Sequence, residues 1–246
     1  MDSGVCVSLE TIVRRQGVTG RYVSRKKAFK TAFLSEGLFT NELSNLMLII
    51  EHRKNTIEEL KAVPRSNGVE IDIRSYGDRL VLHHDPFCTG TDFEEWLEHY
   101  NQSFIILNIK EEGLERRVQA LVEQKGVRNY FYLDLSFPFI VKLVNAGQKN
   151  IAVRFSEYES IDTCLSLAGK VEWVWVDCFS LFPLNKEVHR ELSKHFKICL
   201  VSPELVGRED GIHSMQQDIR GLKIDAVCTK KTKVWGKYQQ DILRGN

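Results

Sequence analysis

The chain has 246 residues, of which 43% are hydrophobic and 27% charged, an ordinary composition for a globular protein with a large core. Its formal net charge of +1 provides no overall basic field, so composition does not indicate a nucleic-acid partner. The longest purely apolar run, 46–50, is far shorter than the roughly 20 residues that span a bilayer, and the amino terminus lacks a secretory signal pattern, so we predict no transmembrane segment.

The six cysteines are widely scattered and form no C-x-x-C pair or zinc-binding spacing with histidine. Several lie inside apolar runs, which is typical of buried thiols in a reducing compartment. We therefore expect a cytoplasmic protein with reduced cysteines.

Residues 1–45 do not share the pattern of the rest of the chain. They could be a helical extension, a basic arm for another partner, or sequence upstream of the domain. We predict a peripheral or poorly ordered N-terminal extension without a catalytic role, followed by one domain over 46–246.

From residue 46 onward, apolar runs of strand length alternate with amphipathic stretches at helical spacing. The eight runs are 46–51, 68–74, 104–110, 130–135, 150–155, 172–177, 197–202 and 225–229. The helical stretches include 112–125, 137–146, 160–168 and 185–195. Strands that are apolar on both faces and alternate with helices predict an α/β fold, a closed parallel TIM-type (β/α)8 barrel.

A ninth apolar run, 80–85, follows the second run after a turn at 76–78. We interpret it as a short extra strand outside the barrel. The tryptophans at 173 and 175 lie within a strand run and are expected in the core rather than in a sugar-binding site.

Polar residues are concentrated near the ends of the first strand runs, where the functional residues of this fold collect. They are Glu51, His52 and Arg53; Glu70, Asp72 and Arg74; His83, His84 and Asp85; and Asn108 and Lys110. Because side chains alternate along a strand, Glu70 and Asp72 share one face.

Two adjacent carboxylates repel each other unless a positive group lies between them. A hard divalent cation, Mg²⁺ or Ca²⁺, is one solution, and an ion pair with Arg74 or Lys110 is the other. The two histidines favour the first, because His52 and His84 could accept and donate protons beside a metal during attack on phosphorus.

The order of these residues resembles the glycerophosphodiester phosphodiesterase family of phospholipase-C-like barrels. The matching motifs are His52-Arg53, Asn55-Thr56, Glu70-x-Asp72, His84-Asp85-Pro86 and a strand that ends in Lys110, with Ser136-Phe137 as a weaker match after the fourth strand. The resemblance implies a small-molecule phosphodiester substrate, acid–base catalysis by His52 and His84, a divalent cation on Glu70 and Asp72, and phosphate contacts from Arg53 and Lys110.

Departures from the family pattern affect four places. Lys54 replaces the glycine of H-R-G in a shortened loop, and Asn108 replaces the first glutamate of E-x-K, so an uncharged amide becomes the third expected metal ligand unless Asp134 contributes. After Thr229, Lys230-Lys231 replaces the usual acid and either faces an anionic substrate or forms a solvated loop. The insertion after the H-D motif is missing, which predicts an open mouth.

Two functions are consistent with this pattern. One is a metal-dependent phosphodiesterase that cleaves glycerophosphodiesters or related phospholipid headgroups. The other is a catalytically weakened barrel that binds a phosphorylated headgroup or a protein partner without turnover, as the replacement by Asn108 suggests.

Overall fold

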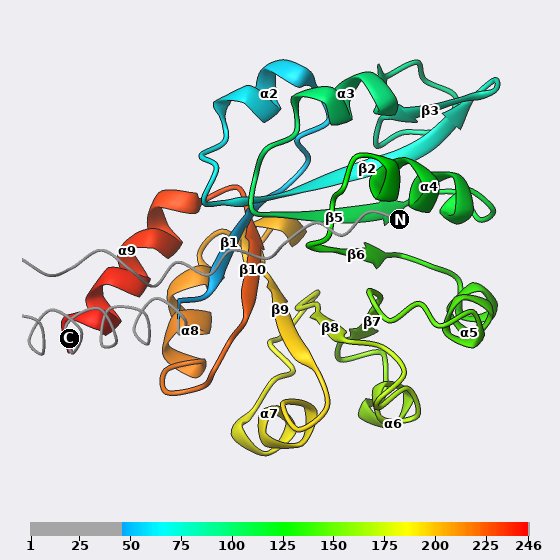
Figure 1. The fold of residues 1–246 in the computed structure, drawn as a ribbon. Helices are drawn as coiled ribbons and strands as arrows, with labels where there is room; N and C mark the ends of the chain where they lie inside the picture. Colours follow the sequence, from blue (N-terminus) through cyan, green and yellow to red (C-terminus); the bar gives the residue numbers. More distant parts are fainter. Residues whose placement is uncertain (1–45, 246) are drawn as a thin grey trace, which may run out of the picture. The chain divides into compact units, whose positions relative to one another are not determined.

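The computed structural model describes residues 46–245, so the predicted N-terminal extension, 1–45, lies outside the described residues. Eight parallel strands curl into a barrel, and helices surround it (Figure 1). The strands are β1 (Leu48–Glu51), β2 (Gly68–Tyr76), β5 (Phe104–Ile109), β6 (Tyr130–Leu133), β7 (Ala152–Phe155), β8 (Trp173–Val176), β9 (Lys197–Val201) and β10 (Ala226–Thr229). Each predicted strand run overlaps one of them, β2 extending two residues beyond its predicted run, and the predicted TIM-type architecture is confirmed.

Neighbouring barrel strands are parallel, in the order β1, β2, β5, β6, β7, β8, β9, β10, and β10 pairs with β1. The weakest junction lies between β6 and β7, which are joined by a single bridge between Tyr132 and Ile151. The short extra strand predicted at 80–85 is present as β3 (Arg79–Leu82). It pairs antiparallel with the outer part of β2, and the two-residue β4 (Thr91–Asp92) pairs with β3.

The helices of the described chain connect successive strands. They are α2 (Ile57–Ala62), α3 (Phe93–His99), α4 (Glu115–Gln124), α5 (Phe137–Asn145), α6 (Ile161–Leu165), α7 (Lys186–Leu192), α8 (Gly211–Asp218) and α9 (Thr232–Leu243), with a 3₁₀ turn η1 (Pro203–Val206) after β9. Several begin at a side chain that caps free backbone N–H groups, namely Thr56, Asp92, Ser136, Ser160 and Asn185. None of the helices between residues 46 and 245 is long and apolar enough to cross a membrane.

The core has two parts because the strands bury both faces. The larger part packs between the outside of the barrel and the helices. The smaller part fills the barrel interior with Ile50, Ile106, Phe131, Leu133, Ala152, Trp173, Trp175, Cys199, Val201, Ala226 and Cys228. The two strand tryptophans are thus core residues, as expected.

The floor of the barrel is tightly filled. The ring of Trp173 lies 5.0 Å from that of Phe131 and 5.4 Å from that of Phe104. A Cβ atom on Gly68 would lie 3.0 Å from Ile50 and 3.1 Å from Phe104. Substrate therefore has no path through the floor, and the polar residues at the other end of the barrel are the accessible ones.

The cysteines at 164, 178, 199 and 228 are buried free thiols, as predicted, and Cys88 is half-buried. Cys6 lies outside the described residues.

Candidate active site at the carboxyl ends of the strands

The centre of the site is a buried pair of carboxylates on the inward face of β2. Glu70 and Asp72 are each only 1% exposed, and Asn108 of β5 lies directly opposite Asp72 in the strand pairing. The Nδ2 atom of Asn108 donates to Oε1 of Glu70 at 2.9 Å and to Oδ1 of Asp72 at 3.5 Å. Three of the predicted metal ligands are therefore brought together.

Positive and amide groups surround these carboxylates. Nζ of Lys110 lies 3.4 Å from Oδ1 of Asp72, and Nε of Arg53 lies 3.6 Å from Oδ2 of the same residue. The Arg53 backbone N–H donates to Oε2 of Glu70 at 2.8 Å. All four carboxylate oxygens of Glu70 and Asp72 thus face a donor from the chain itself.

The ion-pair interpretation of the carboxylates holds for Lys110 but not for Arg74. The Arg74 guanidinium instead lies 3.5 Å from Glu111 and donates to the backbone oxygen of His84 at 3.0 Å.

The pKa of Glu70 is raised from 4.5 to about 7, first by burial and then by the negative charge of Asp72. The amide of Asn108 and the backbone of Arg53 oppose this shift without cancelling it. Burial beside Asp72 therefore disfavours the ionised form of Glu70.

His52 follows β1 and points at this pair. Its Nε2 lies 3.7 Å from Oε2 of Glu70, and its Nδ1 is buried without a hydrogen-bond partner. Burial, followed by the charges of Arg53 and Lys230, lowers the pKa of His52 from 6.5 to about 3. The imidazole is therefore neutral near pH 7, with one ring nitrogen unprotonated.

The shortened loop after His52 is held by long-range hydrogen bonds rather than by a glycine. Arg53 has a positive φ of 53°, the Lys54 backbone N–H donates to the backbone oxygen of Glu70 at 2.9 Å, and Trp96 of α3 donates to the Lys54 carbonyl at 3.0 Å. The side chain of Asn55 exchanges two hydrogen bonds with Asp72, at 2.9 and 3.0 Å. The Asn-Thr motif thus orients a candidate metal ligand and then begins α2 at Thr56.

His84 reaches the same region along the edge of β2. The backbone oxygen of Glu70 accepts a hydrogen bond from the Lys54 N–H, and the backbone oxygen of Asp72 accepts one from the His83 N–H at 3.1 Å. The loop after His52 and the segment after β3 therefore lie one after the other along the same edge of β2. The His84 side chain is 42% exposed and its Nδ1 lies 2.8 Å from Oδ1 of Asp85. Within residues 46–245, no hydrogen bond or ion pair joins His84 to His52 or to the carboxylates of β2.

An ionic chain extends the site across the mouth. Nζ of Lys110 lies 3.1 Å from Oδ2 of Asp134, and Arg154 of β7 pairs with both Asp134 and Asp177. Burial favours a higher pKa for Asp134, but Arg154 and Lys110 hold it below its usual value. Asp134 is thus engaged by cations on the far side of Lys110 and does not join the β2 carboxylates.

Sequence analysis missed Arg154 and Asp177. Each stands at an inward position near the end of its strand, so the alternation that singled out Glu70 and Asp72 could also have found them. Burial raises the pKa of Asp177 to about 6 despite the nearby Arg154.

At the end of β10 the two lysines differ. Lys230 is one of the charges that lower the pKa of His52, whereas Nζ of Lys231 lies 3.3 Å from Glu209. Glu204 of η1 accepts hydrogen bonds from the Thr229 hydroxyl at 2.5 Å and from the Lys230 backbone N–H at 3.0 Å. A carboxylate therefore lies beside Thr229 even though none follows it in the sequence.

No protein-family model matches the sequence, and no curated protein is similar to it in sequence. Two solved structures are similar in fold. A glycerophosphodiester phosphodiesterase from Agrobacterium tumefaciens has a TM-score of 0.55 and 16% identity over 77% of this chain and 99% of its own. A glycerophosphoryl diester phosphodiesterase from Parabacteroides distasonis has a TM-score of 0.57 and 13% identity over 81% of this chain and 88% of its own. This chain has the fold of the glycerophosphodiester phosphodiesterases.

A hard cation fits the donor atoms of this phosphodiesterase-type barrel only if Asn108 takes part. Among the described residues, no three histidine, cysteine or acidic side chains converge closely enough to hold a metal ion. Oδ1 of Asn108 is buried without a partner, and turning the amide over would exchange it with the Nδ2 that faces both carboxylates. Glu70, Asp72 and Asn108 would then present three hard oxygen ligands with two negative charges.

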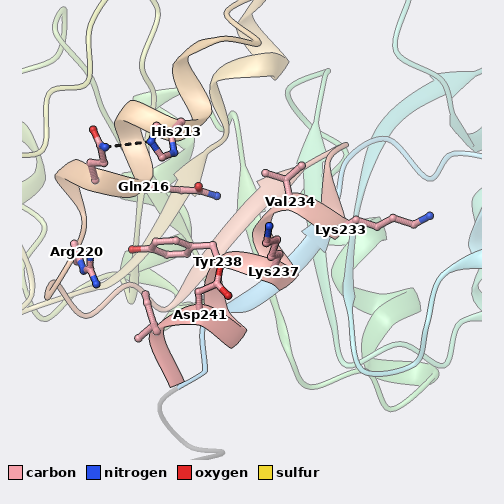
Figure 2. A pocket seen from close by; sticks show the side chains of 10 residues that line it. His213, Gln216, Arg220, Lys233, Val234, Lys237, Tyr238 and Asp241 are labelled. Atoms are coloured by element: carbon pink, nitrogen blue, oxygen red, sulfur yellow. Dashed lines mark hydrogen bonds between the residues drawn. The ribbon is translucent and has the colours of Figure 1, made fainter. Parts of the chain in front are cut away.

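Two cavities differ in their relation to this site. The larger, about 760 Å³, lies outside the barrel between α8 and α9 and is lined by residues such as Gln216, Lys237 and Tyr238 (Figure 2). The smaller, about 440 Å³, lies between β6 and β7 and includes Asp134 and Arg154. Only the smaller of these two shares residues with the ionic chain.

Proposed function

We propose that this protein is a divalent-cation-dependent phosphodiesterase that cleaves glycerophosphodiesters or related phospholipid-headgroup phosphodiesters. One observation carries the proposal: a neutral, buried His52 lies 3.7 Å from a carboxylate of the Glu70–Asp72 pair, at the mouth of a barrel with the phosphodiesterase fold. The experimental tests below address the metal, the histidines and the substrate separately.

In this proposal, His52 is the general base. Its lowered pKa keeps the imidazole unprotonated, and its Nε2 faces the carboxylate pair where the phosphate would be bound. The proton comes from the attacking oxygen, either of water or of a neighbouring hydroxyl of the substrate.

His84 is proposed as the general acid that protonates the leaving oxygen. Its Nδ1 lies 2.8 Å from Oδ1 of Asp85, and its side chain is exposed at 42%, so it is accessible to substrate.

Lys110 and Arg53 would hold the non-bridging phosphate oxygens. Both lie within 3.6 Å of Asp72, and the side chain of Arg53 is partly exposed at the mouth. A bound Mg²⁺ or Ca²⁺ would supply positive charge that stabilises the phosphorane-like transition state. Glu70, Asp72 and Asn108 are the residues that would bind it.

A second candidate function is the binding of a phosphorylated headgroup without turnover. The observation in its favour is that the chain already supplies a donor to every oxygen of the two carboxylates, among them the charged groups of Arg53 and Lys110. Such a site could persist without a metal ion. The positive side chains of Arg53 and Lys110 would then contact the phosphate directly.

The first experiment measures turnover of glycerophosphocholine and glycerophosphoethanolamine with Mg²⁺ or Ca²⁺, before and after chelation. We expect His52→Ala to lower kcat by about 10²–10⁴-fold, the usual contribution of an acid–base group. His99→Ala, on the exposed end of α3, is the matched control and should keep full activity. Turnover that is equal in wild type and His52→Ala would contradict the proposal, and binding without product would favour the second candidate.

The second experiment measures Mg²⁺ and Ca²⁺ binding by calorimetry. Glu70→Gln and Asp72→Asn keep the shape of each side chain and remove its charge, so each should weaken cation binding by at least tenfold. Asp162→Asn, at the start of α6, is the control for loss of a surface charge. Cation binding that survives both substitutions unchanged would place the metal elsewhere.

A further inference from the structure

The barrel wall is open beside the candidate site. β6 and β7 share one bridge, between Tyr132 and Ile151, and beyond it the cleft of about 440 Å³ separates the two strands. This volume lies within the range of about 300–1,000 Å³ that is typical of small-molecule sites.

The cleft lies in the gap between the ends of β6 and β7. Leu133 and Ala152, which line it, belong to the interior cluster, whereas Val153 and Ile140 belong to the cluster between barrel and helices. The cleft therefore borders both parts of the core.

One end of the cleft is charged and meets the candidate phosphate site. Asp134 and Arg154 line this end, and Oδ2 of Asp134 lies 3.1 Å from Nζ of Lys110. A phosphate held by Lys110 would therefore lie next to the inner opening of the cleft.

The other end is apolar and continues onto the surface of α5. Leu135, Phe137 and Ile140 line it, and Phe137 is 46% exposed. Val141, four residues further along the same helix face, is 42% exposed. The apolar lining of the cleft thus continues onto the exposed surface of α5.

We propose that the cleft between β6 and β7 receives the apolar chain of an amphiphilic phosphodiester, such as a lysophospholipid, whose phosphate is held at Lys110. This inference rests on the proposed function for the position of the phosphate. Substrate would enter with its polar group in the mouth and its chain lying across the gap in the wall, along Ile140 and Phe137.

The test compares hexylphosphocholine with decylphosphocholine, two phosphodiesters that differ only in chain length. Binding is measured by calorimetry below the micellar concentrations, with Mg²⁺ present and in the His52→Ala background so that turnover does not interfere. Each buried methylene is worth about threefold to fourfold in affinity, from ~0.8 kcal/mol per CH₂. Four additional methylenes should therefore tighten binding on the order of 100-fold.

Two matched substitutions locate the chain. Thr163→Phe fills the cleft from α6 and should reduce the gain from hexyl to decyl to less than about fivefold. Gln216→Phe places the same side chain in the larger groove between α8 and α9 (Figure 2) and should leave the gain intact. Phe137→Ser, at an exposed position, should reduce the gain in part and serves if Thr163→Phe fails to fold.

Affinity that does not depend on chain length would overturn the inference. A chain-length gain that persists in both Thr163→Phe and Phe137→Ser would also overturn it, because the chain would then bind elsewhere. Turnover of glycerophosphodiesters that requires His52 would still support the proposed function in either case, so the two proposals fail separately.

Discussion

The inside of the barrel has two unlike walls. On β2 and β5, the inward positions near the mouth are Glu70, Asp72 and Asn108. On β8, β9 and β10, the inward positions are apolar, among them Trp173, Trp175, Cys199, Val201 and Cys228. The same alternation of side chains produces both walls. The apolar wall stabilises the fold through packing. The wall formed by β2 and β5 bears buried carboxylates, which destabilise the fold unless a ligand or cation compensates their charge.

The largest expected effect on stability comes from the apolar wall. Trp173→Ala should lower the free energy of unfolding by about 3–5 kcal/mol, because it leaves a cavity against Phe131 and Phe104 that cannot collapse. Urea denaturation measures this loss. Tyr158→Ala, at a position 76% exposed, should change the free energy of unfolding by less than about 0.5 kcal/mol. A loss below about 1 kcal/mol for Trp173→Ala would mean that the barrel interior is loosely packed.

The charged wall should make the free energy of unfolding depend on pH. The pKa of Glu70 is raised by burial and by Asp72 to about 7 from an unfolded value of 4.5, so its contribution is fully present below pH 4.5 and is lost as pH rises towards 7. Without metal, the wild type should therefore lose about 3 kcal/mol relative to Glu70→Gln across this window. Denaturation of both proteins at several pH values provides the measurement.

His52 acts in the opposite direction. Burial, Arg53 and Lys230 lower its pKa from 6.5 to about 3, so the free energy of unfolding grows as pH rises from about 3 to 6.5. Between about pH 4.5 and 6.5, the effects of Glu70 and His52 oppose each other, so the free energy of unfolding of the wild type should be nearly independent of pH. His52→Gln should uncover the decline due to Glu70, and a variant that remains flat between pH 4.5 and 7 would contradict the assignment of charge to that wall.

Asn108→Asp should increase the buried negative charge of the wall formed by β2 and β5. A third carboxylate beside Glu70 and Asp72 should tighten Mg²⁺ or Ca²⁺ binding by about tenfold or more, since ligand charge raises affinity for a hard cation. The same change should lower the melting temperature of the metal-free protein. Calorimetry and thermal denaturation test the two effects together, and equal cation affinity in both proteins would exclude position 108 from the coordination sphere.

The smallest effect is expected at the loop that joins the charged wall to α2. Thr56 accepts a hydrogen bond from the Glu59 N–H, and Glu59 accepts one from the Thr56 N–H, so both ends of a capping box are made. Thr56→Ala should lower the free energy of unfolding by about 1 kcal/mol. Thr56→Ser should retain most of the stability, whereas equal losses in both variants would rule out the cap as the cause.

The sequence predicts the barrel and the centre of the site because both depend on local pattern. Apolar runs of strand length define the barrel strands, and the two-residue period places Glu70 and Asp72 on one face. Gly68 lies on the same face of the strand, where a Cβ atom would lie 3.0 Å from Ile50 and 3.1 Å from Phe104. His52 is likewise placed by the end of β1.

Pairings between distant strands could not be read in the same way. Arg154 joins Asp134 to Asp177, and Glu204 reaches Thr229, only because the register and curvature of the sheet bring separate loops together. Asp134, the alternative metal ligand, is for this reason paired with Lys110 and Arg154. His84 remains a predicted catalytic residue whose position at the mouth depends on the return of β3 along β2.

By itself, the sequence determined which residues are strand, which face of β2 is charged and where the histidines follow their strands, because hydrophobic period and chain order are local properties. The tertiary structure alone decided how the charges are paired and where the wall opens between β6 and β7. These features depend on the distance between neighbouring barrel strands. That distance is set by the packing of the whole barrel rather than by any single segment.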